Sequence, residues 1–416
     1  MPTLRIALIY LLTLLNTTLT FAAPIAHEAY IWRRQWSTEL TQSICEHANL
    51  LSGYTVLAAE ITPSSRGDQV TQIKFDAVAL KQAQVPVTLA IRVGNYPGPF
   101  TPDASTTQTL LHAVGETLKH ARQQGLQPAA IEIDFDCATR KLRGYQAWLE
   151  QLRPVLDGVP LSITTLPTWM SSPDDFAALV QAADHYVLQA HSIQRPTLPH
   201  KAFKLCDAKQ TLQWAQQASE IGHPFHLALP TYGYQLSFDS TGKLVRVDAE
   251  NEPLQTDFNL TVEELSADPV EMAQLINSLQ ATRPEHCQGV IWYRLPSPDE
   301  RLNWDAATWR AVMQGDVALP EWQIQAVPQP NGLVEIQLTH TSPIANQPPA
   351  GICVQWKQAD ALAWDGQRNF TVTQPTNKAL TWSRPVDCPT LAQGERWTLG
   401  WIRFDTETPL QLSIIQ

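Results

Sequence analysis

The chain has 416 residues. That is more than one hydrophobic core usually supports, and it predicts two domains. The formal charge of −11 at pH 7 argues against nucleic acid or an anionic membrane surface as a partner. The 14 tryptophans are compatible with stacking on sugar rings, although large cores also use tryptophan.

The first two dozen residues predict a signal peptide, assigned to residues 1–24. Arg5 precedes an apolar run over residues 6–15, and small residues follow near 22–26. The apolar run is too short for a membrane-spanning helix, and no later stretch approaches about 20 apolar residues. An uncleaved membrane anchor is the alternative. We expect an exported protein, periplasmic or extracellular, without stable membrane insertion after cleavage.

Residues 25–316 alternate between apolar, strand-like runs and helical patterns. The strand-like runs are 29–36, 54–61, 85–93, 129–136, 160–170, 185–193, 224–232 and 289–296. The helical patterns are 106–125, 142–156, 171–183, 207–222 and 304–313. Eight strands interleaved with helices predict an α/β fold of the (β/α)8 TIM-barrel type. A doubly wound open sheet is the alternative, but no G-x-G-x-x-G follows the first strand.

Two further regions depart from this alternation. Residues 235–262 interrupt the seventh unit with a predicted hairpin around Ser240–Gly242, which would wall a cleft on the catalytic side of the barrel. Residues 317–416 contain short alternating runs with many prolines and predict a small all-β sandwich. This domain would be a structural lid or an accessory carbohydrate-binding module.

The segment "IEIDFD" carries acids at every second position, Glu132, Asp134 and Asp136. In a barrel strand all three would point inward, and the apolar residues between them would face the helices. Asp136 lies nearest the carboxyl end, where barrel active sites form. Repulsion from Asp134 and partial burial would raise the pKa of Asp136, as a general acid requires. The alternative is an interior hydrogen-bond or salt-bridge network with arginines.

Three motifs in order resemble those of chitinase-like glycoside hydrolases, the family 18-type TIM barrels. "AIEIDFD" is similar to their G-F-D-I-D-W-E, "LALPTYGY" to L-G-L-P-x-Y-G-R, and "GVIWYRLP" to the G-V-M-x-W strand. The resemblance implies that Asp136 is the catalytic acid, with Asp134 and Glu132 as the acids before it. It also implies that Tyr232 lines the site and that Trp292 forms its floor.

The chain departs from that family pattern at two places. The acid is an aspartate, one methylene shorter than the family's glutamate. The sixth-strand M-x-Y-D is here "QAHS", with His191 and Ser192 in place of the tyrosine and aspartate.

The whole chain resembles more closely an uncharacterised bacterial family, domain of unknown function 3142. The likeness includes "YIWRRQW", "IDFDCATRKLRGY" and "TTLPTWM". It implies a barrel and no particular activity.

Other residues at predicted strand ends are candidates for the site. Glu60 would supply a second carboxylate, and His191 would be a proton shuttle, a hydrogen-bond donor to sugar or a core histidine. Trp32 and Trp169 would be stacking platforms or rim packing. The remaining candidates for substrate binding or for neutralising the acids are Gln189, Arg34, Arg92 and Arg294.

Six cysteines in an exported chain permit disulfides. Cys353 and Cys388 stand alone in the last hundred residues and form the first predicted pair. The barrel would add Cys137 with Cys206 and Cys45 with Cys287, and free buried thiols are the alternative. No C-x-x-C pair or cluster with metal-ligand spacing indicates a cofactor.

These observations predict an exported glycoside hydrolase-like protein that acts on a polysaccharide or oligosaccharide by carboxylate acid/base catalysis. The alternatives are a non-catalytic, lectin-like carbohydrate-binding protein on the same barrel and an envelope interaction protein that uses the sandwich.

Overall fold

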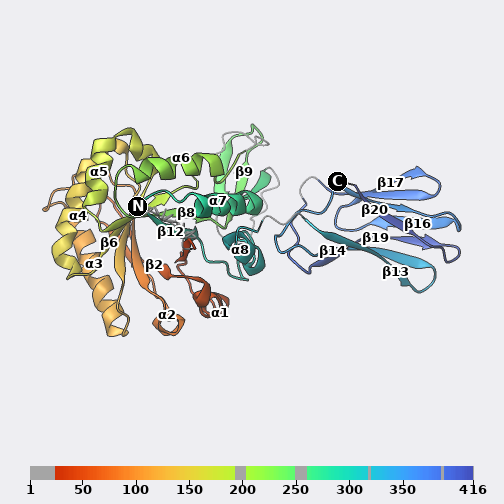
Figure 1. Ribbon diagram of the computed structural model, residues 1–416, viewed down its shortest axis with the longest axis horizontal. Helices are drawn as coiled ribbons and strands as arrows, with labels where there is room; N and C mark the ends of the chain where they lie inside the picture. Colours follow the sequence, from red (N-terminus) through yellow and green to blue (C-terminus); the bar gives the residue numbers. More distant parts are fainter. Residues whose placement is uncertain (1–23, 193–202, 249–259, 317–319, 386–387, 416) are drawn as a thin grey trace, which may run out of the picture.

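A computed structural model describes residues 24–192, 203–248, 260–316, 320–385 and 388–415. It consists of a helix-covered barrel joined end to end with a β-sandwich (Figure 1). The proposed signal peptide lies outside the described residues, apart from its last position.

Eight parallel strands form a closed barrel, because β1 pairs with β12 on one side and with β2 on the other. This confirms the predicted TIM-barrel fold. The barrel strands are β1 (Ala26–Ile31), β2 (Gly53–Thr62), β4 (Val87–Val93), β5 (Ala130–Asp134), β6 (Leu161–Thr165), β7 (His185–Gln189), β8 (Phe225–Pro230) and β12 (Cys287–Tyr293).

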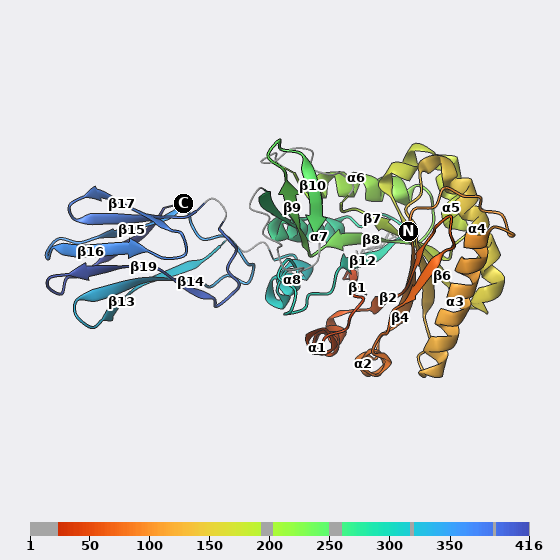
Figure 2. The same ribbon diagram turned by 180° about the vertical axis from the view of Figure 1, so that it is seen from behind.

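Helices cover the outside of the barrel, as both views show (Figures 1 and 2). They are α1 (Thr38–His47), α2 (Ala77–Ala83), α3 (Ser105–Gln123), α4 (Leu142–Leu156), α5 (Pro173–Gln181), α6 (Ala208–Ser219), α7 (Pro269–Ala281) and α8 (Ala306–Met313). The helical spacing on α4 is typical of the layer: Tyr145, Trp148 and Leu152 recur along one face and are fully buried against the strands.

Two additions stand at the carboxyl ends of the strands. The short strand β3 (Gln69–Gln72) pairs antiparallel with the end of β2, beyond the part of β2 that pairs with β1. After β8, the strands β9 (Gly233–Phe238), β10 (Leu244–Asp248) and β11 (Thr261–Ser266) form an antiparallel sheet. The predicted hairpin over residues 235–262 is thus present as β9 and β10, and β11 adds a third strand.

The C-terminal part contains two four-stranded antiparallel sheets. One orders β13 (Trp322–Gln329), β14 (Leu333–His340), β19 (Arg396–Phe404) and β16 (Ala361–Gly366). The other orders β17 (Thr371–Thr376), β18 (Ala379–Ser383), β15 (Gly351–Gln355) and β20 (Gln411–Ile415). Buried residues from both sheets, including Leu338, Ile352 and Trp382, form a core separate from the barrel core.

The predicted disulfides are absent from the structure, in which all six cysteines are free. Cys45 is exposed on α1, whereas its predicted partner Cys287 is buried at the start of β12. The Cys206 thiol lies 3.4 Å from the Thr211 hydroxyl and does not meet Cys137. The other predicted pair fails in the same way: on β15 Cys353 is half-buried, whereas Cys388 is buried in the sandwich core. Within the described part of the chain, no helix has the length and apolarity needed to cross a membrane.

Candidate functional site

The carboxyl ends of β2, β4, β5 and β6 place alternating charges in one row. Strand register sets Glu60 beside Arg92 and Arg92 beside Asp134. The Arg92 guanidinium lies 3.6 Å from the Glu60 carboxylate and 3.9 Å from that of Asp134. Arg34 also reaches Glu60, at 2.6 Å, and Thr164 on β6 donates to Asp134 at 2.7 Å. The three apolar residues of "IEIDFD" are fully buried on the other face, which confirms the predicted orientation of this strand.

Glu132 lies one layer deeper and is only 1% exposed. The Tyr30 hydroxyl donates to one of its carboxyl oxygens at 2.8 Å, and the Ser162 hydroxyl donates to the other at 3.0 Å. Burial raises the pKa of Glu132 to about 8, against the opposing effect of these two hydrogen bonds. Glu132 is therefore mostly protonated at neutral pH and contributes to the interior hydrogen-bond network rather than to the mouth.

Asp136 lies two residues beyond the end of β5 and is exposed to solvent. Within the described chain its carboxyl group has no hydrogen-bond or ion-pair partner, in contrast with Glu132 and Asp134. Neighbouring protein atoms still desolvate it, and this desolvation with the charge of Asp134 raises its pKa to about 6, although Arg92 acts in the opposite direction. Burial also raises the pKa of Asp134, against the opposing effects of the Thr164 hydrogen bond and the Arg92 charge. An accessible, unpaired carboxyl group with a raised pKa is suited to general acid catalysis.

An aromatic cluster occupies the opposite side of the barrel interior. Tyr293, at the end of β12, is its centre. The centroid of the Tyr293 ring lies 5.7 Å from that of Trp32, 5.2 Å from that of His191 and 5.3 Å from that of Tyr232. Tyr30 joins the cluster at 5.7 Å from Tyr293 and bonds across the interior to Glu132. Tyr30, Trp32, His191 and Tyr232 are buried, and Tyr293 is half-buried, so Tyr293 is the ring of the cluster that is most open to the mouth.

Hydrogen bonds join β7, β8 and β9 beside this cluster. His191 Nδ1 lies 3.2 Å from the Tyr232 hydroxyl, which is 2.9 Å from the Tyr234 hydroxyl. Tyr234 in turn lies 2.7 Å from the Ser192 hydroxyl. Burial lowers the pKa of His191 to about 3, so its imidazole is neutral at physiological pH. His191 is thus a buried, neutral group that is hydrogen-bonded to Tyr232.

Trp292 does not form the floor of the site. Its side chain is fully buried on the outer face of β12, stacked on His27 at 5.9 Å with its indole N–H directed at His27 Nδ1. Successive residues of a strand face opposite sides, so Tyr293 takes the inward position. The family motif G-V-M-x-W, counted from Gly289, already puts Trp292 at its variable position and Tyr293 at its last.

Two other predicted site residues are also directed elsewhere. Trp169 is 1% exposed and donates to the Cys137 carbonyl at 3.0 Å, so it packs among helices rather than at the rim. Arg294 is 5% exposed and pairs with Glu300 at 2.9 Å. By contrast, Trp32 joins the interior cluster, and Gln189 is half-buried at the end of β7.

Metal ligands do not gather in the part of the chain that the structure describes. There, no group of three or more histidine, cysteine, aspartate or glutamate side chains is arranged to hold an ion.

A family model described as Domain of unknown function (DUF3142) matches residues 86–298. Among curated proteins, no sequence matches the chain. Solved structures with similarity include the spore cortex-lytic enzyme SleL of Bacillus cereus, at 15% identity and a TM-score of 0.46, covering 71% of this chain and 75% of that one. A chitinase from Chromobacterium violaceum has 16% identity and a TM-score of 0.48, covering 71% of this chain and 100% of that one. Chitinase ChiA74 from Bacillus thuringiensis has 10% identity and a TM-score of 0.44, and the match covers 94% of this chain and 100% of that one.

Proposed function

The chain belongs to the DUF3142 family, and we propose that it is an exported glycoside hydrolase that cleaves a polysaccharide or oligosaccharide by carboxylate acid/base catalysis. The observation that carries the proposal is Asp136: an accessible, unpaired carboxyl group whose pKa of about 6 follows from desolvation and the charge of Asp134. Export rests on the signal-peptide pattern of residues 1–24.

In the proposed mechanism, Asp136 donates its proton to the glycosidic oxygen as the bond to the leaving sugar breaks. Glycosidases pair such an acid with a second carboxylate. Glu60 is the candidate, because it stands in the same row of strand ends and is held by Arg34 and Arg92. Acting as the base, Glu60 accepts a proton from the attacking water, whose oxygen forms the new bond to the sugar carbon as the bond to the leaving sugar breaks. Exchange with solvent then returns the proton from Glu60 and reprotonates Asp136. Asp134 keeps the pKa of Asp136 raised, and the aromatic side of the site supports the sugar ring.

The decisive variant is Asp136→Asn, which keeps the shape of the side chain and removes its proton. We expect it to lower turnover by a factor of about 10²–10⁴, measured as reducing-end release from a glycan panel, while sugar binding stays largely intact. Asp174→Asn on α5, an exposed aspartate outside the site, is the matched control and should behave as the parent. Unchanged turnover in Asp136→Asn would remove the assignment.

A lectin-like protein is the second candidate, and one observation favours it. Chitinase-like glycoside hydrolases have a tyrosine and an aspartate at the end of the sixth strand. Here those positions are held by His191, which is buried and neutral, and by Ser192, which is hydrogen-bonded to Tyr234. Binding on the same glycan panel without any reducing-end release by the parent protein would select this alternative.

A further inference from the structure

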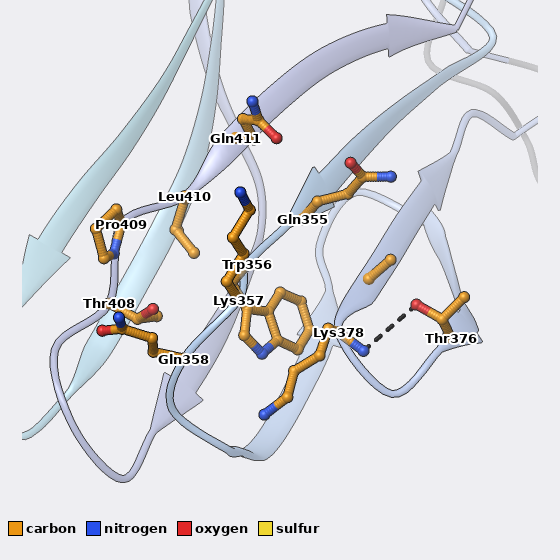
Figure 3. Close-up of a pocket in the computed structure, with 11 residues that line it drawn as sticks. Gln355, Trp356, Lys357, Gln358, Thr376, Lys378, Thr408, Pro409, Leu410 and Gln411 are labelled. Atoms are coloured by element: carbon orange, nitrogen blue, oxygen red, sulfur yellow. Dashed lines mark hydrogen bonds between the residues drawn. The ribbon is translucent and has the colours of Figure 1, made fainter.

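The β-sandwich contains a pocket of about 420 Å³ that the barrel site does not use. Figure 3 shows its lining side chains, which come from the end of β15 and the segment after it, the β17–β18 turn and the start of β20. These residues are Gln355, Trp356, Lys357, Gln358, Thr376, Lys378, Ala379, Thr408, Pro409, Leu410 and Gln411.

This pocket stands at the end of the sandwich remote from the barrel. Gln355 pairs with Gln411 at one end of the β15–β20 ladder, and Gly351 pairs with Ile415 at the other. The Ile415 end leads to the C-terminus, which lies toward the barrel (Figure 1). A ligand in the pocket would therefore be held apart from the Asp136 carboxyl group.

Two polar atoms in the pocket lack the partners that buried polar atoms normally have. Trp356 is only 4% exposed, and its indole N–H has no hydrogen-bond acceptor within the described residues. The Thr408 hydroxyl is likewise buried and without a partner there. Figure 3 places the Trp356 ring in the middle of the lining residues. Both atoms are covered by neighbouring protein atoms, so a ligand would reach them only if the lining side chains shifted.

The charge of the pocket contrasts with that of the chain. Both lysines of residues 317–416, Lys357 and Lys378, line it, and none of its eleven lining residues is acidic. Lys378 is held at its rim by Asp360 at 2.8 Å. Lys357 is exposed and has no ion-pair partner within the described residues.

We propose that this pocket binds a carboxylate-bearing sugar, the uronic acid unit of an acidic oligosaccharide. Lys357 supplies the cation for the carboxylate, and the lining contains no arginine, the side chain best suited to a phosphate. The amides of Gln355, Gln358 and Gln411 can each donate to and accept from hydroxyl groups. Pro409 and Leu410 offer an apolar surface to the C–H face of the ring, and the volume lies in the range of small-ligand sites.

Such a site would tether an acidic polysaccharide and raise its effective concentration at the barrel. This inference does not depend on the proposed hydrolysis, because it concerns binding alone. It predicts that the full chain binds uronic acid oligosaccharides even when turnover is abolished.

The test is calorimetric titration of the full-length Asp136→Asn chain with oligogalacturonide and oligoalginate. We expect binding of at least one of them, and weaker binding of a methyl-esterified oligogalacturonide if the unesterified form binds. Lys357→Gln in the same background should weaken binding by about tenfold, the value of a lost charge-assisted hydrogen bond. Arg403→Gln, which removes an exposed charge on β19 outside the pocket, is the matched control and should change nothing.

Absence of binding to both probes would overturn the proposal, as would equal affinity of Lys357→Gln and its parent. Equal loss in Lys357→Gln and Arg403→Gln would reduce the effect to overall charge and overturn it too. In the active chain, Lys357→Gln should leave the initial rates on a short soluble substrate unchanged. Failure of the barrel proposal would therefore appear as absent turnover, and failure of the pocket proposal as absent or unchanged binding.

Discussion

Three acids of one strand end in three different environments. Glu132 is buried and doubly hydrogen-bonded, Asp134 is half-buried between Thr164 and Arg92, and Asp136 is exposed and unpaired. Burial is the largest cause of the raised pKa in each case. A carboxyl group thus serves as a structural group at Glu132 and as a candidate acid at Asp136, four residues further along the same segment. Two variants test this gradient.

The first prediction concerns the coupling between Asp134 and Asp136. Because the negative charge of Asp134 raises the pKa of Asp136, Asp134→Asn should lower that pKa. An acid of lower pKa loses its proton sooner as pH rises, so the basic limb of the kcat/KM profile should move from about pH 6 to a lower pH. Asp174→Asn should leave the profile in place. A basic limb that stays fixed or moves upward in Asp134→Asn would contradict the coupling.

The second prediction concerns Glu132 and stability. Its pKa is about 8 in the folded protein against 4.5 without burial, so the folded state binds the proton more tightly. The contribution of protonated Glu132 to the free energy of unfolding is therefore fully present below about pH 4.5. It is lost as pH rises toward 8, by up to about 1.4 kcal/mol per pH unit. Glu132→Gln does not titrate, and its free energy of unfolding should fall less steeply between pH 5 and pH 8 in urea titrations.

Glu116→Gln, on the exposed surface of α3, is the control for that slope. It should retain the pH dependence of the parent. A slope in Glu132→Gln equal to that of the parent would show that Glu132 ionises without cost in the folded state.

At the scale of elements, the alternation of side chains between the two faces of a strand decides which of them reach the site. On β5 the alternation is unambiguous because acids and apolar residues alternate, and the structure confirms it. On β12 both Trp292 and Tyr293 are aromatic, so residue type gives no contrast between the faces. The structure assigns Trp292 to the barrel–helix layer and Tyr293 to the interior.

This assignment predicts different effects for the two residues. Trp292→Ala should reduce the free energy of unfolding by about 3–5 kcal/mol, because it empties a fully buried site against His27. Tyr293→Leu keeps a large apolar side chain and should cost less stability, yet it should weaken sugar binding because the central ring of the aromatic cluster is lost. Denaturant unfolding and glycan titration measure the two effects.

Trp292→Phe provides a milder variant in case Trp292→Ala does not fold. It should lower the stability by less than the alanine variant and leave sugar binding unchanged. Weakened binding in Trp292→Phe, with Tyr293→Leu silent, would reverse the assignment of the two faces.

At the scale of the whole molecule, the barrel and the sandwich each have a core of their own. A hydrogen bond from the Ala345 amide to the Thr308 hydroxyl on α8 links them, at 2.9 Å. The six cysteines are spread over both parts, and all of them are free. Stability therefore rests on the two cores.

The free state of the six cysteines can be tested by counting thiols. Under denaturing, non-reducing conditions the purified protein should present six titratable thiols. In the native protein Cys45 should react first, because it is the exposed one, and the half-buried Cys353 should follow more slowly. A denatured count of four or fewer would establish at least one disulfide and restore the sequence-based expectation.

Length, periodicity and residue type determined the barrel, the sandwich and the acidic strand. These features depend on local alternation of apolar and polar residues, which the chain displays directly, as in "IEIDFD". Helices α1, α2 and α7 escaped the same analysis, and α2 is only seven residues long. Only the tertiary structure decided which candidates meet: that Arg92 stands between Glu60 and Asp134, that Arg294 is taken by Glu300, and that His191 bonds to Tyr232. The contacts of Arg92 and of His191 join strand ends far apart in sequence, and they follow from register and closure of the barrel, which no single segment encodes. Glu300 lies six residues after Arg294, and the path of the chain after β12 brings the two together.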